Sequence, residues 1–134
     1  MSQENVKTVR SMNAAFESGD VPTVLWSMDP EIVWNEAENF PYADGNPYVG
    51  PDAIVEGVFM RLVGEWDYWN LAIEEVLDAG DRVLALGRYQ AKNKATGTVL
   101  NAQFAHFWGF RDGKAVNFQQ YADTHQAQRA VGNR

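Results

Sequence analysis

A chain of 134 residues fits a single domain spanning 1–134, and its 46% hydrophobic and 22% charged residues exclude a disordered chain. The formal charge of −7, with basic residues scattered singly, argues against nucleic acid as a partner, and the absence of cysteine excludes disulfides and Cys-ligated metal sites. No apolar run approaches the roughly 20 residues of a membrane span, so we expect no membrane association and a cytoplasmic location.

Three helices are predicted in the first half of the chain. Apolar residues at helical spacing indicate a first helix over residues 2–18. Asp20 is placed to cap a short second helix that starts at Val21. Asp52 is placed in the same way to cap a third helix, whose apolar face ends near Gly64.

A strand and a long loop are predicted between the second and third helices. Alternation with a period of two indicates a strand over residues 31–37. One side of this alternation carries Ile32, Trp34 and Glu36. Residues 38–51 hold three prolines, two glycines and two tyrosines, and we interpret this loop as a lid over a pocket.

The second half of the chain is predicted to form four strands, at 68–77, 82–91, 99–110 and 115–123. Turn signals separate them, and the strongest is Asp112-Gly113, because this dipeptide favours a two-residue hairpin loop. The order of helix, helix, strand, helix and four antiparallel strands predicts an α+β fold. The twist of its sheet would let one face wrap around the helices.

The hairpin at Asp112-Gly113 predicts how the last two strands pair. With a two-residue loop, His106 faces Gln119 and Phe104 faces Tyr121. Because alternate residues share a face of a sheet, one side carries a row of polar and aromatic residues. This row is Ala102, Phe104, His106, Trp108, Phe110, Ala115, Asn117, Gln119, Tyr121 and Asp123. A bulge in either strand would invert the face of every residue beyond it.

The row includes Phe104, Trp108 and Tyr121, and exposing such rings forfeits roughly 1.5–3 kcal/mol of burial each. We therefore interpret this face as the concave lining of a ligand pocket rather than as a solvated face. There, His106 and Asp123 are candidates for acid–base catalysis, because imidazole titrates near neutral pH and burial raises the pKa of a carboxyl group. The alternatives are a core histidine bonded to a neighbour and an aspartate at the surface.

Other aromatic residues are candidates for the pocket walls, although each also suits the core. They are Trp34, Tyr48, Trp66, Trp69 and Tyr89. Glu36, Asp44 and Arg88 could act in the site, but we expect them on the solvated surface. No phosphate-binding loop, dinucleotide fingerprint or His-x-x-x-His pair is present, so we expect neither a cofactor nor a metal.

Three segments resemble the SnoaL-like polyketide cyclases, a branch of the superfamily that contains nuclear transport factor two and ketosteroid isomerase. They are the strand Gln103-Phe-Ala-His-Phe-Trp, the turn Arg111-Asp-Gly-Lys and the final Phe118-Gln-Gln-Tyr-Ala-Asp-Thr. The resemblance implies a cone-shaped barrel of the cystatin-like type, in which a strongly curved, mostly antiparallel sheet wraps around the N-terminal helices. It also implies a pocket inside the cone and a homodimer formed through the sheet.

The resemblance also assigns site residues. In the SnoaL-like cyclases a histidine on the penultimate strand and an acid–base aspartate on the last strand lie in the pocket, and His106 and Asp123 match them. A glutamine that the cyclases place two residues before the histidine falls on Phe104, which departs from the pattern.

The leading hypothesis is a cofactor-independent isomerase or cyclase that acts on a hydrophobic, carbonyl-bearing small molecule. Asp123 would abstract a proton, and His106 with Gln119 or Tyr121 would stabilise the enolate oxygen. Further wall residues in this hypothesis are Phe104, Trp108, Trp34, Tyr48, Tyr89 and Trp66. The alternatives are a binding domain without catalysis, an epoxide hydrolase-like enzyme that uses Arg88, and a polar row that serves as a dimer interface.

Overall fold

The computed structural model describes residues 2–133 and contains helices and strands in the predicted order, with additions. The helical elements are α1 (Ser2–Glu17), α2 (Val21–Trp26), η1 (Ala43–Gly45), α3 (Pro51–Ile54), η2 (Val55–Phe59), α4 (Met60–Glu65) and α5 (Thr124–Ala130). The strands are β1 (Met28–Asn35), β2 (Tyr48–Val49), β3 (Trp66–Ala79), β4 (Arg82–Asn93), β5 (Val99–Arg111) and β6 (Lys114–Ala122).

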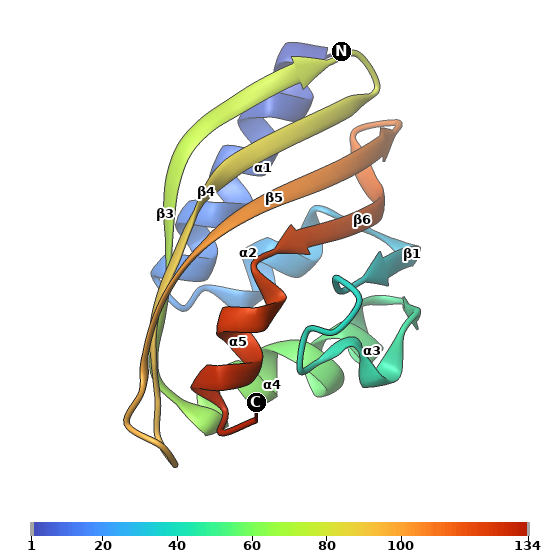
Figure 1. Ribbon diagram of the computed structural model, residues 1–134. Helices are drawn as coiled ribbons and strands as arrows, with labels where there is room; N and C mark the ends of the chain where they lie inside the picture. Colours follow the sequence, from blue (N-terminus) through green and yellow to red (C-terminus); the bar gives the residue numbers. More distant parts are fainter. Residues whose placement is uncertain (1, 134) are drawn as a thin grey trace.

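Within residues 2–133 the strands form one curved sheet in the order β2-β1-β6-β5-β4-β3 (Figure 1). The pairs are antiparallel except for β1 and β6, which run parallel. The sheet stays open, with β2 and β3 as its edges. The predicted α+β fold, with a mostly antiparallel sheet wrapped around N-terminal helices, is therefore confirmed.

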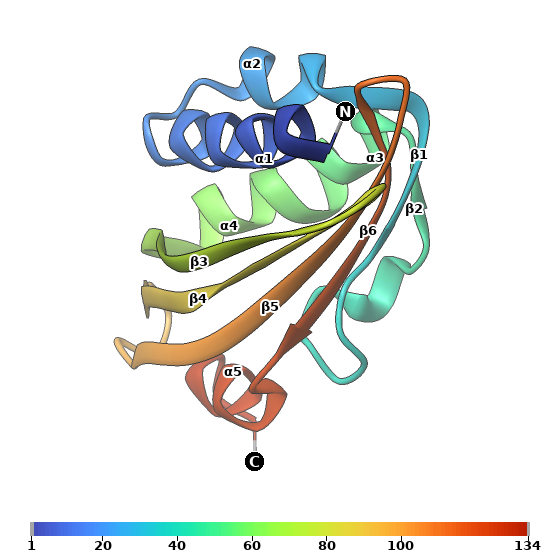
Figure 2. The same ribbon diagram turned by 90° about the horizontal axis from the view of Figure 1, so that it is seen from above.

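The helices cover the concave face of the sheet. α1 packs against β3 and β4, and Figure 2 shows α1 and α4 on the same side of the sheet. Val9 and Met12 of α1 are buried in the core together with Ile54 of α3 and Leu62 of α4. Burial of such apolar side chains is the main force that holds the helices on the sheet.

Local chemistry explains where the helices begin. The Asp20 carboxylate accepts a hydrogen bond from the Thr23 backbone N–H at 3.2 Å, which confirms the predicted cap of α2. The predicted cap at Asp52 was wrong, because Pro51 already occupies the first turn of α3 and Gly50 is the cap residue. Helix α5 was not predicted, because the polar residues that compose it show little apolar periodicity.

The predicted loop over residues 38–51 is tied to the sheet at one end. Val49 and Tyr48 of β2 pair with Val33 and Trp34 of β1. The Tyr48 hydroxyl also donates a hydrogen bond to the backbone oxygen of Tyr42 at 2.6 Å. Among residues 2–133, no helix is long and apolar enough to span a membrane.

An extra residue interrupts the pairing of β5 with β6. Phe110 pairs with Ala115, but Gly109 pairs with Asn117, so Val116 is left as a bulge. Gly109 suits this position because a Cβ atom there would lie 2.3 Å from the Asn117 Oδ1 atom. The predicted register was therefore wrong by one residue beyond Gly109, and Gln120 rather than Gln119 faces His106.

A second glycine permits close contact between β3 and β4. Gly87 lies beside the point in β3 where the register shifts, and a Cβ atom on it would lie 2.3 Å from the backbone oxygen of Ala72. A rigid backbone atom cannot move away as a side chain can. An alanine at this position would therefore force the two strands apart.

We predict that Gly87→Ala lowers the free energy of unfolding by roughly 1–3 kcal/mol, the usual cost of overpacking. Urea denaturation followed by tryptophan fluorescence measures the change. Gly64→Ala is the matched control, because nothing lies within 4 Å of a Cβ atom at this position in α4. Equal stability of the two variants would contradict the close contact at Gly87.

Candidate functional site

A cavity lies between the concave face of the sheet and the helices, and aromatic side chains form much of its wall. About 60 Å³ is available inside to the centres of water-sized molecules. One water requires about 10–15 Å³ on this scale, so the cavity can hold several waters or a compact organic group. The polar residues in its lining are Asn13, Glu36, Tyr89, His106 and Gln120.

Glu36 places a carboxyl group in this cavity. It directly follows β1 and is only 3% exposed, and its Oε2 atom accepts a hydrogen bond from Trp34 Nε1 at 2.8 Å. The Glu36 backbone N–H donates a hydrogen bond to Asn46 Oδ1 at 2.9 Å, and Asn46 Nδ2 donates one to the Glu36 backbone oxygen at 2.8 Å. Burial raises the pKa of Glu36 to about 7, although the hydrogen bond from Trp34 opposes the shift. The carboxyl group can therefore both take and release a proton near neutral pH.

His106 faces the same cavity in its neutral form. It is buried in β5, and its ring stacks on Phe104 with centroids 4.1 Å apart. Burial lowers the pKa of His106 to about 3, because the apolar surroundings destabilise the imidazolium form. The imidazole can therefore donate or accept a hydrogen bond without carrying a charge.

A chain of hydrogen bonds leads from the backbone to His106. The backbone N–H of Ala37 donates to Gln120 Oε1 at 3.0 Å, and Gln120 Nε2 donates to the Tyr89 hydroxyl at 2.8 Å. The Tyr89 hydroxyl lies 2.5 Å from His106 Nε2. These buried groups come from different parts of the chain, and the fold alone brings them together.

Three buried nitrogen atoms in side chains that line the cavity have no hydrogen-bond partner within residues 2–133. They are Asn13 Nδ2, His106 Nδ1 and Trp108 Nε1. Buried polar atoms in folded proteins are nearly always paired. These three nitrogen atoms therefore depart from the usual rule, and all belong to side chains of the cavity lining.

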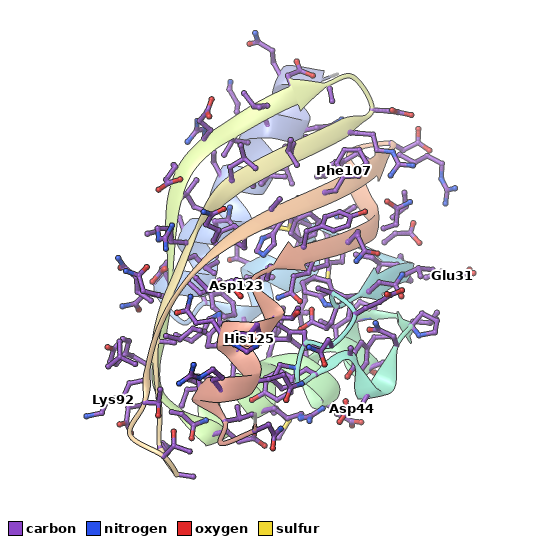
Figure 3. The ribbon with its side chains drawn as sticks, in the orientation of Figure 1. Glu31, Asp44, Lys92, Phe107, Asp123 and His125 are labelled. Atoms are coloured by element: carbon purple, nitrogen blue, oxygen red, sulfur yellow. The ribbon has the colours of Figure 1, made fainter. Side chains whose placement is uncertain are left out.

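The bulge at Val116 moves three predicted site residues away from His106. Gln119 and Tyr121 fall on the outer face of the sheet, where they border a separate groove, and Tyr121 is 57% exposed. Asp123 is exposed and caps α5, accepting a hydrogen bond from the Gln126 backbone N–H at 3.1 Å (Figure 3). The expectation that Asp123 and His106 share one hollow was therefore wrong.

The sequence matches the SnoaL-like domain family over residues 9–118. The chain belongs to this family. A solved NTF2-like protein from Burkholderia thailandensis is 34% identical, with a TM-score of 0.90 over 95% of this chain and 96% of that chain. An NTF2-like protein of unknown function from Burkholderia pseudomallei is 28% identical, with a TM-score of 0.88 over 96% and 98%.

A third solved structure is that of TerC co-crystallized with polyporic acid. It is 26% identical, with a TM-score of 0.85 over 96% of this chain and 98% of TerC. None of the curated proteins matches this SnoaL-like chain. The resemblance inferred from the three sequence segments is thus confirmed at the level of family and fold.

The other aromatic residues predicted to line the pocket of this SnoaL-like domain divide into two groups. Trp34, Trp69, Tyr89 and Trp108 line the cavity together with His106. Phe104, Tyr48 and Trp66 are buried but do not line it. Phe104 stacks on Tyr89 with ring centroids 4.5 Å apart, and Trp66 Nε1 donates a hydrogen bond to the Tyr42 hydroxyl at 2.9 Å.

Two other expectations concern charged residues and metals. Asp44, whose side chain is 60% exposed, pairs with the half-buried Arg61 at 2.7 Å, and the half-buried Arg88 donates to the exposed Asn101 at 2.8 Å. Neither Asp44 nor Arg88 lines the cavity. In the described part of this SnoaL-like domain, residues 2–133, no group of three or more His, Asp or Glu side chains could hold a metal ion.

Glu36 and Gln120 are the functional candidates that sequence reasoning undervalued or missed. The expectation that Glu36 lies on the solvated surface was wrong, because Glu36 shares the alternation of Ile32 and Trp34, which are buried. Gln120 was missed because the bulge changes the face of the strand on which it lies. Gly109 inside a strand was the sequence feature that indicated a bulge.

We predict that Glu36→Gln changes how stability depends on pH. Because the folded pKa of about 7 exceeds the ordinary 4.5, the neutral carboxyl contributes its full stability below about pH 4.5 and loses it as pH rises through 7. The free energy of unfolding of Glu36→Gln, relative to wild type, should therefore increase by roughly 3 kcal/mol between those limits.

Urea denaturation at a series of pH values measures this difference. Glu38→Gln, two residues away at the exposed surface, is the matched control for the loss of one carboxyl group. If the change in the free energy of unfolding caused by Glu36→Gln equals that caused by Glu38→Gln at every pH, the raised pKa of Glu36 is contradicted.

Proposed function

We propose that this SnoaL-like domain catalyses proton transfer next to the carbonyl group of a hydrophobic small molecule, without a cofactor. The observation that carries the proposal is the meeting of Glu36 and His106 in one aromatic-lined cavity. One is a carboxyl group with a pKa of about 7, and the other is an imidazole that stays neutral. Isomerases and cyclases of this kind need such a pair, since a base takes the proton and a donor stabilises the resulting oxyanion.

Glu36 takes the role of the base. Its carboxylate removes a proton from the carbon beside the carbonyl group, and the electron pair of the broken C–H bond moves onto the carbonyl oxygen. The His106 imidazole donates a hydrogen bond to that oxygen. Return of the proton from Glu36 to a different carbon completes an isomerisation. Alternatively, attack of the enolate carbon on a second carbonyl group forms a ring, and the alkoxide produced takes the proton back from Glu36.

The walls of the cavity favour this chemistry in two ways. Trp34, Trp69 and Phe118 offer aromatic surface to an apolar ligand. They also separate a bound ligand from bulk water, so that each hydrogen bond to the oxyanion acts in surroundings of low polarity. The co-crystal of TerC with polyporic acid supports small-molecule binding as the use of the fold.

We also propose that the chain forms a homodimer through the outer face of the sheet. Phe107 of β5 alternates with His106 and therefore points away from the cavity. Phe107, labelled in Figure 3, pairs with Leu84 of β4, and Ala105 pairs with Leu86 two residues along the same strands. These apolar side chains are partly exposed and adjoin on the outer face. Contiguous apolar surface of this kind is typical of a protein interface.

We predict that the protein accelerates deuterium incorporation into compact ketones. A panel of aryl ketones and 1,3-diketones incubated in D₂O, followed by mass spectrometry, detects proton abstraction without knowledge of the natural product. Glu36→Gln should lower the rate by at least about 100-fold, the usual contribution of a general base. The wild-type rate should rise with pH and level off above about pH 7, as Glu36 ionises.

Glu38→Gln is the control in this assay, because it removes an exposed carboxyl group near the same strand. Ligand binding is followed separately through tryptophan fluorescence. If ketones bind but exchange deuterium no faster with the wild type than with Glu36→Gln, the domain binds ligands without catalysing proton transfer.

We predict that Phe107→Glu dissociates the dimer, because it places a charge in the centre of the apolar face. Sedimentation equilibrium across a range of protein concentrations measures the mass in solution. Val63→Glu is the matched control, since Val63 is 76% exposed on α4, away from the sheet. A monomeric wild type at every concentration would refute the interface.

A further inference from the structure

We propose that Gln120 and Tyr89 are positioning residues that fix the proton of His106 on Nδ1, so that the cavity selects ligands with a hydrogen-bond-accepting oxygen. The inference rests on the proposed function only in placing the ligand in this cavity. It follows from the direction in which each hydrogen bond of the buried chain must run.

The direction is set at Ala37. Its backbone N–H can only donate, and it does so to the Gln120 side chain at 3.0 Å. The atom of Gln120 that faces Ala37 must therefore be the amide oxygen, which directs Nε2 toward Tyr89. Gln120 is 3% exposed, so bulk water does not compete for either end of the amide.

The same direction passes through Tyr89. An amide NH₂ group can only donate, so the Tyr89 hydroxyl oxygen is the acceptor of the 2.8 Å bond from Gln120. Tyr89 has one hydroxyl proton, and His106 Nε2 lies 2.5 Å away. Tyr89 is also buried, so its proton is best used in the bond to Nε2. His106 Nε2 is therefore the acceptor of that bond and carries no proton.

The tautomer of His106 is then determined. A neutral imidazole carries one N–H group, and with Nε2 accepting, the proton must be on Nδ1. Nδ1 is buried and has no hydrogen-bond partner within residues 2–133, while the His106 ring lines the cavity. The backbone of Ala37 thus dictates, through two side chains, that His106 offers the ligand a donor.

The other unpartnered nitrogen atoms of the cavity have the same character. Trp108 Nε1 can only donate, and Asn13 Nδ2 belongs to an amide NH₂ group. A ligand that satisfies these groups must present acceptor atoms, such as carbonyl or ether oxygens. A ligand that offers only hydrogen-bond donors would leave three buried N–H groups unpaired, at a substantial cost in affinity.

Imidazole ¹⁵N NMR tests the tautomer without any ligand. The chain has two histidines, so a His125→Gln variant assigns the His106 signals. Long-range ¹H–¹⁵N correlations near neutral pH should show a protonated Nδ1 and an unprotonated Nε2 in His106. A proton on Nε2 would overturn the inference.

Tyr89→Phe tests whether the hydrogen-bond chain is the cause. It removes the hydroxyl group and should convert the single tautomer of His106 into a mixture of both. Tyr68→Phe is the matched control, because Tyr68 is 42% exposed, and it should leave the His106 pattern unchanged. An unaltered Nδ1–H tautomer in Tyr89→Phe would show that Tyr89 does not set it. If Tyr89→Phe does not fold, the wild-type spectrum still decides.

The outcomes separate this inference from the proposed catalysis. An Nδ1–H tautomer together with a failed deuterium exchange assay would leave a binding site that selects acceptor oxygens. Deuterium exchange that depends on Glu36, together with an Nε2–H tautomer of His106, would support the proposed catalysis but refute the positioning role of Gln120 and Tyr89.

Discussion

The extra residue Val116 in β6 decides which side chains of that strand reach the cavity. Because successive residues of a strand point to opposite faces, a shift of one position turns Phe118 and Gln120 inward. Gln120 then lies within hydrogen-bond distance of both Ala37 and Tyr89. Without this bulge the buried polar chain that ends at His106 would not exist.

Burial in the cavity acts on its two titratable groups in opposite directions. Removal from water disfavours every charged form, so it raises the pKa of Glu36 and lowers that of His106. At neutral pH His106 is therefore uncharged, while Glu36 is divided between its neutral and its charged form. The same aromatic side chains that stabilise the fold also prepare a weak acid and an uncharged hydrogen-bonding group for the ligand.

The sequence carried more information about Glu36 than about Gln120. Glu36 continues the alternation of Ile32 and Trp34, and strict application of that period places it on the buried face. A general preference of carboxyl groups for the surface outweighed this signal. Gly109 inside a strand indicates a bulge, but it does not say which of the two paired strands gains the residue.

From the sequence alone, the resemblance of three segments indicated the family. The order of the main helices and strands, and the inward face of β5 with His106 and Trp108, followed from local periodicity and turn chemistry, which neighbouring residues encode. Only the tertiary structure decided that Glu36 rather than Asp123 shares the cavity, and that Gln120 supports Tyr89. Those relations join residues as far apart as Ala37 and Gln120, and they depend on one bulge, whose position is fixed by packing between strands rather than by local sequence.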